Sequence, residues 1–194
     1  MLTIKNVKHS EFASHETNCF ECSVYWDAKK VGYAENSGQG GETNIHFTDK
    51  QAQTQAEAWE KEQPKIVTDY PAIKKTTNAA GNEVTLTTIN PEPDNQDCEF
   101  FSYAFTLESH IDDLIVKFLT KRDLVRALKT KLIVVDDNCG PNAAFIWKFN
   151  QGINKRWPTP EALYEKVKEV QKFQNPKCLN LMPIEAACEI WGAP

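Results

Sequence analysis

The strongest pattern in the sequence is that of an amphipathic helix over residues 108–129. Apolar residues recur there three or four positions apart, the spacing that lines one face of an α-helix. They are Ile111, Leu114, Ile115, Phe118 and Leu119, followed by Leu124, Val125 and Leu128. Because such a helix must bury its apolar face against another element, we expect it to be the central helix and to pack on a sheet.

Alternating apolar residues before this helix predict a β-hairpin. In the strand 19–27 one face carries Phe20, Cys22, Val24 and Trp26. A short turn leads into a second strand, VGYAEN at residues 31–36, and the pattern pairs Trp26 with Val31. Val24 then lies opposite Tyr33, so both strands present apolar side chains to the same face. Residues 2–8 predict a further strand.

The remaining patterns complete an α+β fold. Residues 48–51 (TDKQ) have the spacing of a capping box before a helix that ends at Pro64. Strands at 131–137 and 143–150 are joined by a turn at 138–142, and Thr159-Pro160 and Pro183 each open a helix. Residues 65–99 predict a weak hairpin around 78–82 and then an exposed linker. We expect an antiparallel sheet with an N-terminal and a central hairpin, packed by three to four helices.

The length of 194 residues fits a single domain over residues 1–194. A subdivision is also compatible with the sequence. It would separate a sheet-rich part, residues 1–99 with an acidic linker near 90–99, from a helix-hairpin-helix part, residues 100–194. No internal repeat is found.

Charge and apolar content limit the setting in which the protein works. The net charge of −5 disfavours a dedicated nucleic-acid binder, which needs a positive field. No signal-peptide pattern and no apolar run of membrane-spanning length occurs, so we expect a cytoplasmic protein. The six cysteines are then most simply free thiols.

Basic residues gather in the second half of the chain. Residues 1–106 hold 9 Lys and Arg against 16 Asp and Glu, whereas residues 107–194 hold 13 against 11. A run along the 108–129 helix includes Lys117, Lys121, Arg122 and Arg126. Such a run is typical of a solvated helix face, and the alternative is a docking patch for an acidic partner.

A glycine-rich stretch, SGQGGETN at residues 37–44, invites interpretation as a phosphate loop. A phosphate loop joins a buried strand to a helix and often ends in Gly-Lys-Ser/Thr. Here Glu42 follows the glycines and residues 43–47 look extended, which favours a wide turn. If the loop is instead a recognition surface, its candidate residues are Gln39, Gly40, Gly41, Glu42, Asn44 and His46.

No other motif predicts catalysis or metal binding. A strand places Cys19 and Cys22 on opposite faces unless it begins after Cys19, and there is no second CxxC pair. The histidines, at 9, 15, 46 and 110, show no metal-binding spacing, although the first three lie near Glu11, Glu16 and Cys19. Ser elbows of the GxSxG type do not occur. The sequence therefore favours a non-catalytic protein and predicts no metal and no cofactor.

Two stretches together resemble a family of uncharacterised bacterial and phage proteins. They are HSEFASHETNCFECSVYWDAKKVGYAENSGQGG (residues 9–41) and SHIDDLIVKFLTKRDLVRALKTKLIVV (residues 109–135). In that family a Glu-Thr-x-Cys-Phe segment leads into a Val-Tyr-x-Asp-Gly-Lys-Lys-Val hairpin and a glycine-rich loop. Ala28 replaces the turn glycine here, which argues against a type I′ turn. The resemblance covers a third of the chain and implies a mobile-element setting, with no catalytic residues.

These observations support three functional hypotheses. The first is a non-catalytic binding protein, a phage or mobile-element accessory factor that binds or inhibits a host or defence protein. The alternative is an enzyme or ligand-binding protein for a nucleotide-like small molecule at the glycine-rich loop and nearby histidines. The third, an acidic mimic of nucleic acid, is weakened by the basic helix.

Overall fold

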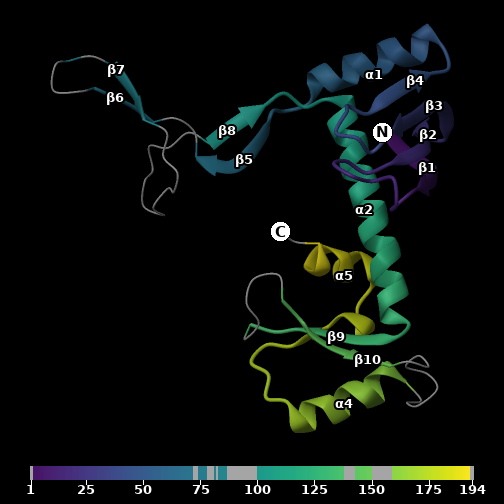
Figure 1. The fold of residues 1–194 in the computed structure, drawn as a ribbon, viewed down its shortest axis with the longest axis vertical. Coiled ribbons are helices and arrows are strands. Elements are labelled where there is room, and N and C mark those ends of the chain that lie inside the picture. Colours follow the sequence, from purple (N-terminus) through teal and green to yellow (C-terminus); the bar gives the residue numbers. More distant parts are fainter. Residues whose placement is uncertain are drawn as a thin grey trace. The chain divides into compact units, whose positions relative to one another are not determined.

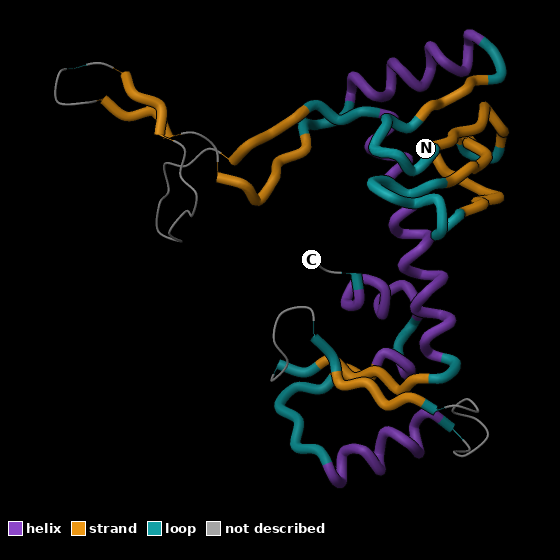
Figure 2. Tube along the Cα trace, in the orientation of Figure 1, coloured by secondary structure: helices purple, strands orange, loops and turns teal. Residues whose placement is uncertain are grey.

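The computed structural model describes residues 2–71, 74–77, 81, 83–86, 100–137, 143–149 and 159–192. Within these ranges it has four α-helices and antiparallel sheets, which confirms the predicted α+β fold (Figures 1 and 2). In chain order the elements are β1 (Leu2–His9), β2 (Phe20–Trp26), β3 (Lys29–Asn36), β4 (Asn44–Phe47), α1 (Lys50–Glu62), β5 (Ile66–Pro71), β6 (Lys74–Thr77), β7 (Glu83–Leu86), β8 (Phe100–Tyr103), α2 (Leu107–Leu128), β9 (Lys131–Val135), β10 (Phe145–Lys148), α4 (Pro160–Val170), β11 (Lys177–Cys178), η1 (Leu179–Leu181) and α5 (Ile184–Trp191).

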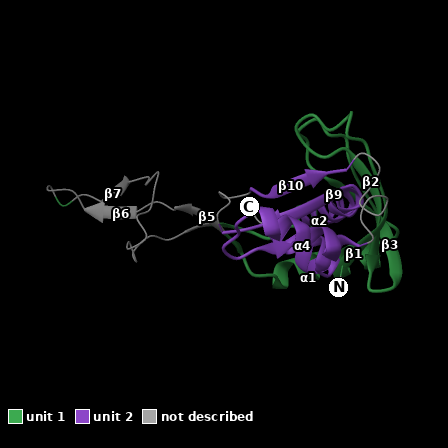
Figure 3. Cartoon of the chain, turned by 90° about the horizontal axis from the view of Figure 1, so that it is seen from below, with its two compact units in different colours: residues 1–112 green, residues 113–194 purple. Residues whose placement is uncertain are grey.

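The chain divides into two compact units, residues 1–112 and residues 113–194 (Figure 3). The division falls within α2, so this helix contributes to both units. The acidic linker predicted near residues 90–99 lies outside the described residues. None of the helices in the described ranges combines the length and apolar character needed to cross a bilayer.

The sheet of unit 1 is an antiparallel meander in the order β1-β2-β3-β4. β2 buries Phe20, Cys22 and Val24 on one face, as their alternation predicts. The register with β3 differs from the prediction, because the pairing shifts between Val24 and Tyr25. Val24 lies opposite Gly32, and Trp26 lies opposite Lys29.

This shift moves Tyr33 away from the apolar face. Tyr33 pairs with Ser23 and is 42% exposed, so its predicted place opposite Val24 was wrong. A shift of one residue transfers a side chain to the other face of a sheet. In the connecting turn Asp27 has φ +52° and Ala28 does not have positive φ, so the turn is not type I′, as the missing glycine predicts.

Helix α1 begins one residue later than its capping-box spacing suggests. Asp49 is the N-cap, and its side chain accepts a hydrogen bond of 2.8 Å from the backbone N–H of Ala52. The backbone N–H of Thr48 instead donates to the carbonyl of Val31, which continues the β3–β4 ladder. Ala52 and Ala56 are the buried residues of the helix, and the half-buried Trp59 packs its ring edge-on against the rings of Trp26 and Phe105.

Two short pairs of strands follow α1. β6 and β7 pair antiparallel on either side of the hairpin predicted around residues 78–82, where Gly81 has φ +82°. β5 pairs antiparallel with β8, more than 30 residues later in the chain. The sequence patterns did not predict this second pairing.

Helix α2 has nearly the predicted bounds but buries a different set of side chains. Leu107, Ile111 and Ile115 are buried and lie four residues apart. Leu124, also buried, comes nine residues after Ile115, which is about half a turn around the helix. The buried residues therefore lie on two different faces, with Leu107, Ile111 and Ile115 on one and Leu124 on the other.

The single continuous stripe predicted for this helix is accordingly only partly buried. Phe118 and Val125 belong to the predicted stripe but are 41% and 39% exposed. Leu114 is half-buried. The sequence shows that the helix is amphipathic, but the direction of its apolar face changes along its length.

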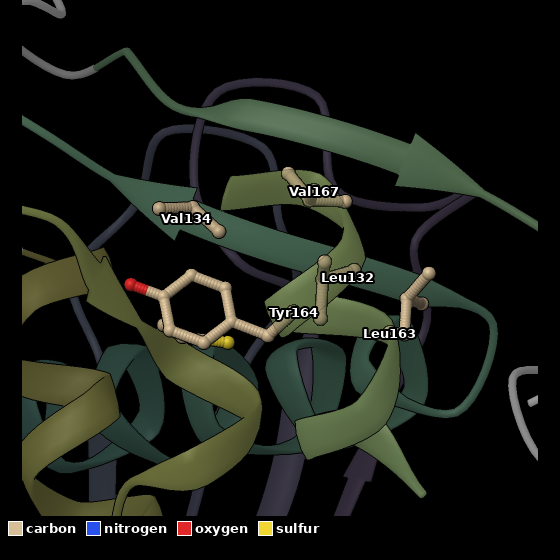
Figure 4. Packing of buried hydrophobic residues seen from close by; sticks show 6 residues of the cluster. Leu132, Val134, Leu163, Tyr164 and Val167 are labelled. Carbon is tan, nitrogen blue, oxygen red and sulfur yellow. The ribbon is translucent and has the colours of Figure 1, made fainter. Parts of the chain in front are cut away.

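Unit 2 is built on a small antiparallel sheet in the order β10-β9-β11. The predicted central hairpin is present as β9 and β10, and its turn at residues 138–142 lies outside the described residues. Leu132 and Val134 of β9 pack in one cluster with Leu163, Tyr164 and Val167 of α4 (Figure 4). Ile133, on the other face of β9, packs with Leu124, Leu179 and Ala187.

Two polar side chains, the half-buried Asn180 and the buried Asp136, hold the loops of unit 2. Asn180 accepts a hydrogen bond from the N–H of Ile133 at 3.0 Å and donates to the carbonyls of Leu128 and Lys131. Asp136, 3% exposed, accepts hydrogen bonds from the backbone N–H groups of Gln174 and Asn175. Asp136 thus has a structural role.

Candidate functional site

Two loops meet at one end of the unit 1 sheet. Loop 10–19 joins β1 to β2, and loop 37–43 joins β3 to β4; we call them together the loop surface. The buried side chain of Asn36 connects them. Its Oδ1 accepts hydrogen bonds from the Thr17 hydroxyl at 2.8 Å and the Gly38 N–H at 2.9 Å. Its Nδ2 donates to the Gly41 carbonyl at 3.0 Å and to Thr43 Oγ1 at 3.2 Å.

The glycines of loop 37–43 bring this loop close to loop 10–19. The carbonyl of Gly38 accepts hydrogen bonds from the N–H groups of His15 and Glu16 at 2.9 and 3.0 Å. Gly38 and Gly40 have φ +82°, a conformation that favours glycine. A Cβ at Gly38 would clash with the carbonyl oxygen of Ala13. The glycine pattern is thus explained by turn geometry and a close backbone approach.

This arrangement does not resemble a phosphate loop. The N–H of Gly38 is taken by Asn36, and the segment after the glycines is the strand β4, not a helix. Thr43 is buried, and its hydroxyl donates to Asp112 Oδ1 at 2.5 Å. The loop is held in place at its start and at its end.

Loop 10–19 is fixed by the side chain of Ser14. Its hydroxyl donates to the carbonyl of Ser10 at 2.7 Å and accepts from the N–H of Cys19 at 2.8 Å. The ring nitrogen Nε2 of His9 lies 3.4 Å from the same oxygen. Because the hydroxyl proton is directed at a carbonyl, Ser14 is placed as a brace and not as a nucleophile activated by His9.

Phe12 lies within this braced loop and is 93% exposed. It is the most exposed of the large apolar side chains in the described part of the chain. An aromatic ring left in water on a backbone fixed by hydrogen bonds is typical of a contact residue. The sequence interpretation missed Phe12, because it was assigned only to the segment between two strands.

An open cavity of about 520 Å³ lies beside the loop surface. Its lining combines the ends of strands with both loops, and includes His9, Cys19, Glu21, Glu35, Asn36 and Asn44. Two carboxylates thus line the cavity, and one of them, Glu21, lies 3.3 Å from Lys8.

The predicted recognition residues fall in three places. Gln39, Gly40, Gly41 and Glu42 are exposed in loop 37–43, and Asn44 lines the cavity. His46 lies two residues further along β4, on the exposed face of the sheet. There its ring stacks on Tyr33, with centroids 4.4 Å apart, and its Nε2 lies 3.3 Å from Glu35. The structure therefore brings five of the six close to the loop surface.

The alternative basic patch on α2 is largely paired with acidic residues. Lys121 lies 2.9 Å from Glu185, and its hydrogen bond to that carboxylate lowers the Glu185 pKa. Arg122 and Arg126 both contact Asp123, at 2.8 and 3.7 Å. Lys117 is exposed. Two carboxylates thus contact three of the four cations and offset about half of the positive charge of the patch.

The cysteines and histidines in the described part of the chain do not form a reactive cluster. Cys22 is buried beneath the sheet, and burial raises the pKa of its thiol to about 11. Cys19, Cys22, Cys178 and Cys188 are free thiols. Across the residues that the structure describes, no group of three His, Cys, Asp or Glu side chains is placed to hold a metal ion.

Comparisons of this chain with protein families, with characterised proteins and with solved structures found no match. The resemblance of residues 9–41 and 109–135 to uncharacterised bacterial and phage proteins therefore stays a prediction. The functional inference rests on the geometry of the chain itself.

Proposed function

We propose that this chain is a non-catalytic binding protein that engages a protein partner through the loop surface of unit 1. In the setting implied by the family resemblance, the partner is a host or defence protein, which the chain binds and inhibits. The observation that carries the proposal is the exposure of Phe12 on a loop held by hydrogen bonds.

Phe12 can contribute to the affinity for a partner, and its loop loses little conformational entropy on binding. Moving a fully exposed aromatic side chain into an apolar pocket contributes about 1.5–3 kcal/mol. The loop backbone is already ordered by Ser14 and by its contacts to Gly38, so little conformational freedom is lost on binding. Phe12 is accordingly the residue whose truncation should weaken binding most.

The charge around Phe12 specifies the partner. Loops 10–19 and 37–43 contain Glu11, Glu16 and Glu42 but no lysine or arginine. Electrostatic complementarity then favours a partner with an apolar pocket surrounded by basic residues. Binding through such contacts should weaken as the salt concentration rises.

The test compares two exposed apolar residues in different units. Wild-type protein, Phe12→Ser and the control Val170→Ser are immobilised and exposed to a bacterial lysate; Val170 is 87% exposed on α4. The wild type and the control should retain the same protein in stoichiometric amount, and Phe12→Ser should lose it. Equal retention by all three proteins would contradict the proposal.

The cavity beside the loops supports a second candidate, a site for a nucleotide-like small molecule. Its volume of about 520 Å³ lies in the range of small-molecule sites. Glu21 and Glu35 line it against the cation of Lys8, which leaves a net negative lining, so an uncharged nucleoside fits this cavity better than a nucleotide. A rise in melting temperature with adenosine or cytidine that is lost in Asn44→Ala would favour this candidate.

A further inference from the structure

Strand β4 is an edge strand of the unit 1 sheet, and among the described residues no second strand pairs with its outer side. It pairs with β3 on one side, and the N–H of Thr48 donates to the carbonyl of Val31. In an antiparallel ladder hydrogen-bonded and non-hydrogen-bonded pairs alternate. His46, opposite Tyr33, is therefore in a hydrogen-bonded pair. The backbone N–H and C=O groups of Ile45 and Phe47 point away from β3, towards the free edge.

A groove with a volume of about 530 Å³ runs beside the same two residues. Ile45 and Phe47 line it from β4, Gln53 and Glu57 from α1, and Leu107 and Glu108 from the start of α2. It shares no lining residue with the cavity at the loop surface. The free edge of the sheet thus borders an open space that another segment of chain could enter.

The walls of the groove are acidic. Asp49, Glu57, Glu60 and Glu108 contribute carboxylates, against the single cation of Lys50. Burial, followed by the negative charges of Glu108 and Glu57, raises the pKa of Glu60. These carboxylates are close enough to repel one another, so a cationic ligand between them would relieve the repulsion.

We propose that this groove binds an extended basic peptide segment of a partner protein, which adds to the sheet as a fifth strand beside β4. Backbone groups of the peptide pair with those of Ile45 and Phe47, and its lysine or arginine side chains contact the acidic walls. This site is independent of the loop surface and does not rest on the function proposed for it.

The composition of β4 shows no residue that would protect this strand edge against pairing with another chain. Proteins protect exposed edges by keeping the edge strand short, by placing lysines, prolines or bulges in it, or by covering it with a helix or loop. β4 is short, with four residues. Its sequence, Asn-Ile-His-Phe, contains no lysine or proline, and it pairs with β3 without a register shift. The charges lie instead on α1 and α2, where they border the groove and leave the strand edge open.

The test uses a synthetic peptide of alternating threonine and lysine, capped at both ends and labelled with a fluorophore. Two controls keep its length: one has glutamate in place of lysine, and the other has every backbone amide methylated. The lysine peptide should bind at low ionic strength, measured by fluorescence anisotropy, and neither control should bind. Methylation retains the charge but removes the donors needed for strand pairing, so equal binding of that peptide would overturn the proposal.

Amide hydrogen exchange measured by NMR locates the peptide. In the free protein the amides of Ile45 and Phe47 should exchange fast, whereas that of His46 should be protected by β3. Saturating lysine peptide should slow exchange at Ile45 and Phe47 by about tenfold, the effect expected of one added hydrogen bond. Unchanged exchange at both positions would exclude strand addition.

Charge variants on α1 complete the test. The double variant Glu57→Gln with Glu60→Gln should weaken binding of the lysine peptide by roughly fivefold or more. Glu62→Gln is the matched control, because Glu62 is exposed on the same helix and does not line the groove. Equal weakening by Glu62→Gln would mean that the net charge of the helix, and not the groove, attracts the peptide.

Discussion

Alanine substitutions of the three loop glycines should have graded effects on stability. Gly38 has φ +82°, and an alanine there costs about 1–2 kcal/mol from backbone conformation alone. Its Cβ would also clash with the carbonyl oxygen of Ala13. To relieve that clash the two loops must separate, which weakens the hydrogen bonds from His15 and Glu16 to the Gly38 carbonyl. Each of these contributes about 1 kcal/mol, so Gly38→Ala should cost roughly 3 kcal/mol or more.

The other two glycines provide internal controls. Gly40 has the same φ, but a Cβ there would meet the side-chain carboxylate of Glu16, which can rotate away. Gly40→Ala should therefore cost only the conformational term, about 1–2 kcal/mol. Gly41 does not have positive φ, and its Cβ would point into open space. Gly41→Ala should change stability by about 0.5 kcal/mol or less, or stabilise slightly by restricting the unfolded chain.

The assay is urea unfolding followed by NMR signals of β2 and β3 amides, because these report on unit 1 alone. The expected order of destabilisation is Gly38 first, then Gly40, then Gly41. Equal losses at the three positions, or a loss at Gly38 no larger than that at Gly40, would refute the close approach of the two loops.

Three further changes test the packing and electrostatics of the two units. Leu124→Ala removes a fully buried side chain and should cost about 2–5 kcal/mol in urea melts, whereas Leu114→Ala, at a half-buried position, should cost less. Asp49→Ala removes the N-cap of α1 and should cost about 1 kcal/mol; no measurable loss would mean that Thr48 caps the helix. The pKa of the Cys22 thiol is about 11 in the folded protein against an ordinary 9.0, so the unfolded state loses this proton first as the pH rises. The contribution of the Cys22 thiol to the free energy of unfolding is fully present below pH 9.0 and should be lost between pH 9.0 and about 11. If the free energy of unfolding of Cys22→Ala falls with pH in the same way, another group is responsible for the loss.

Patterns of a single strand or helix were readable from the sequence. The alternation of Phe20, Cys22 and Val24 gave the buried face of β2 correctly, because a strand places every second residue on one side. The apolar spacing in residues 108–129 located α2 to within a residue at each end. Both features depend on local geometry alone.

Features that depend on contacts with another part of the chain could not be predicted from the local sequence. The one-residue shift that exposes Tyr33 arises from an irregular pairing between β2 and β3. The change of buried face along α2 depends on what each part of the helix contacts. The β5–β8 pairing joins strands far apart in the chain. For β2, β3 and α2 the sequence predicts the element and tertiary contacts decide its orientation, whereas neither β5 nor β8 was predicted as a strand.

The loop surface could be predicted from the sequence only in part. The glycines signalled a turn, but the role of Asn36 could not be inferred, because its partners Thr17 and Thr43 come from different segments. A cue for Phe12 was available: it is an isolated aromatic residue in a segment rich in Ser, Glu and Thr. An apolar residue without an amphipathic pattern around it has no predicted core to enter, so the exposure of Phe12 could have been predicted.

Site-specific photo-crosslinking tests the central claim, that Phe12 contacts a protein partner. The photoreactive residue p-benzoylphenylalanine replaces Phe12 in one protein and Val170 in another, and each is irradiated in bacterial cells. Both positions are exposed, at 93% and 87%, so non-specific capture should be equal. Position 12 should give one dominant crosslinked protein, identified by mass spectrometry, which position 170 does not give. The same set of weak products from both positions would contradict the account.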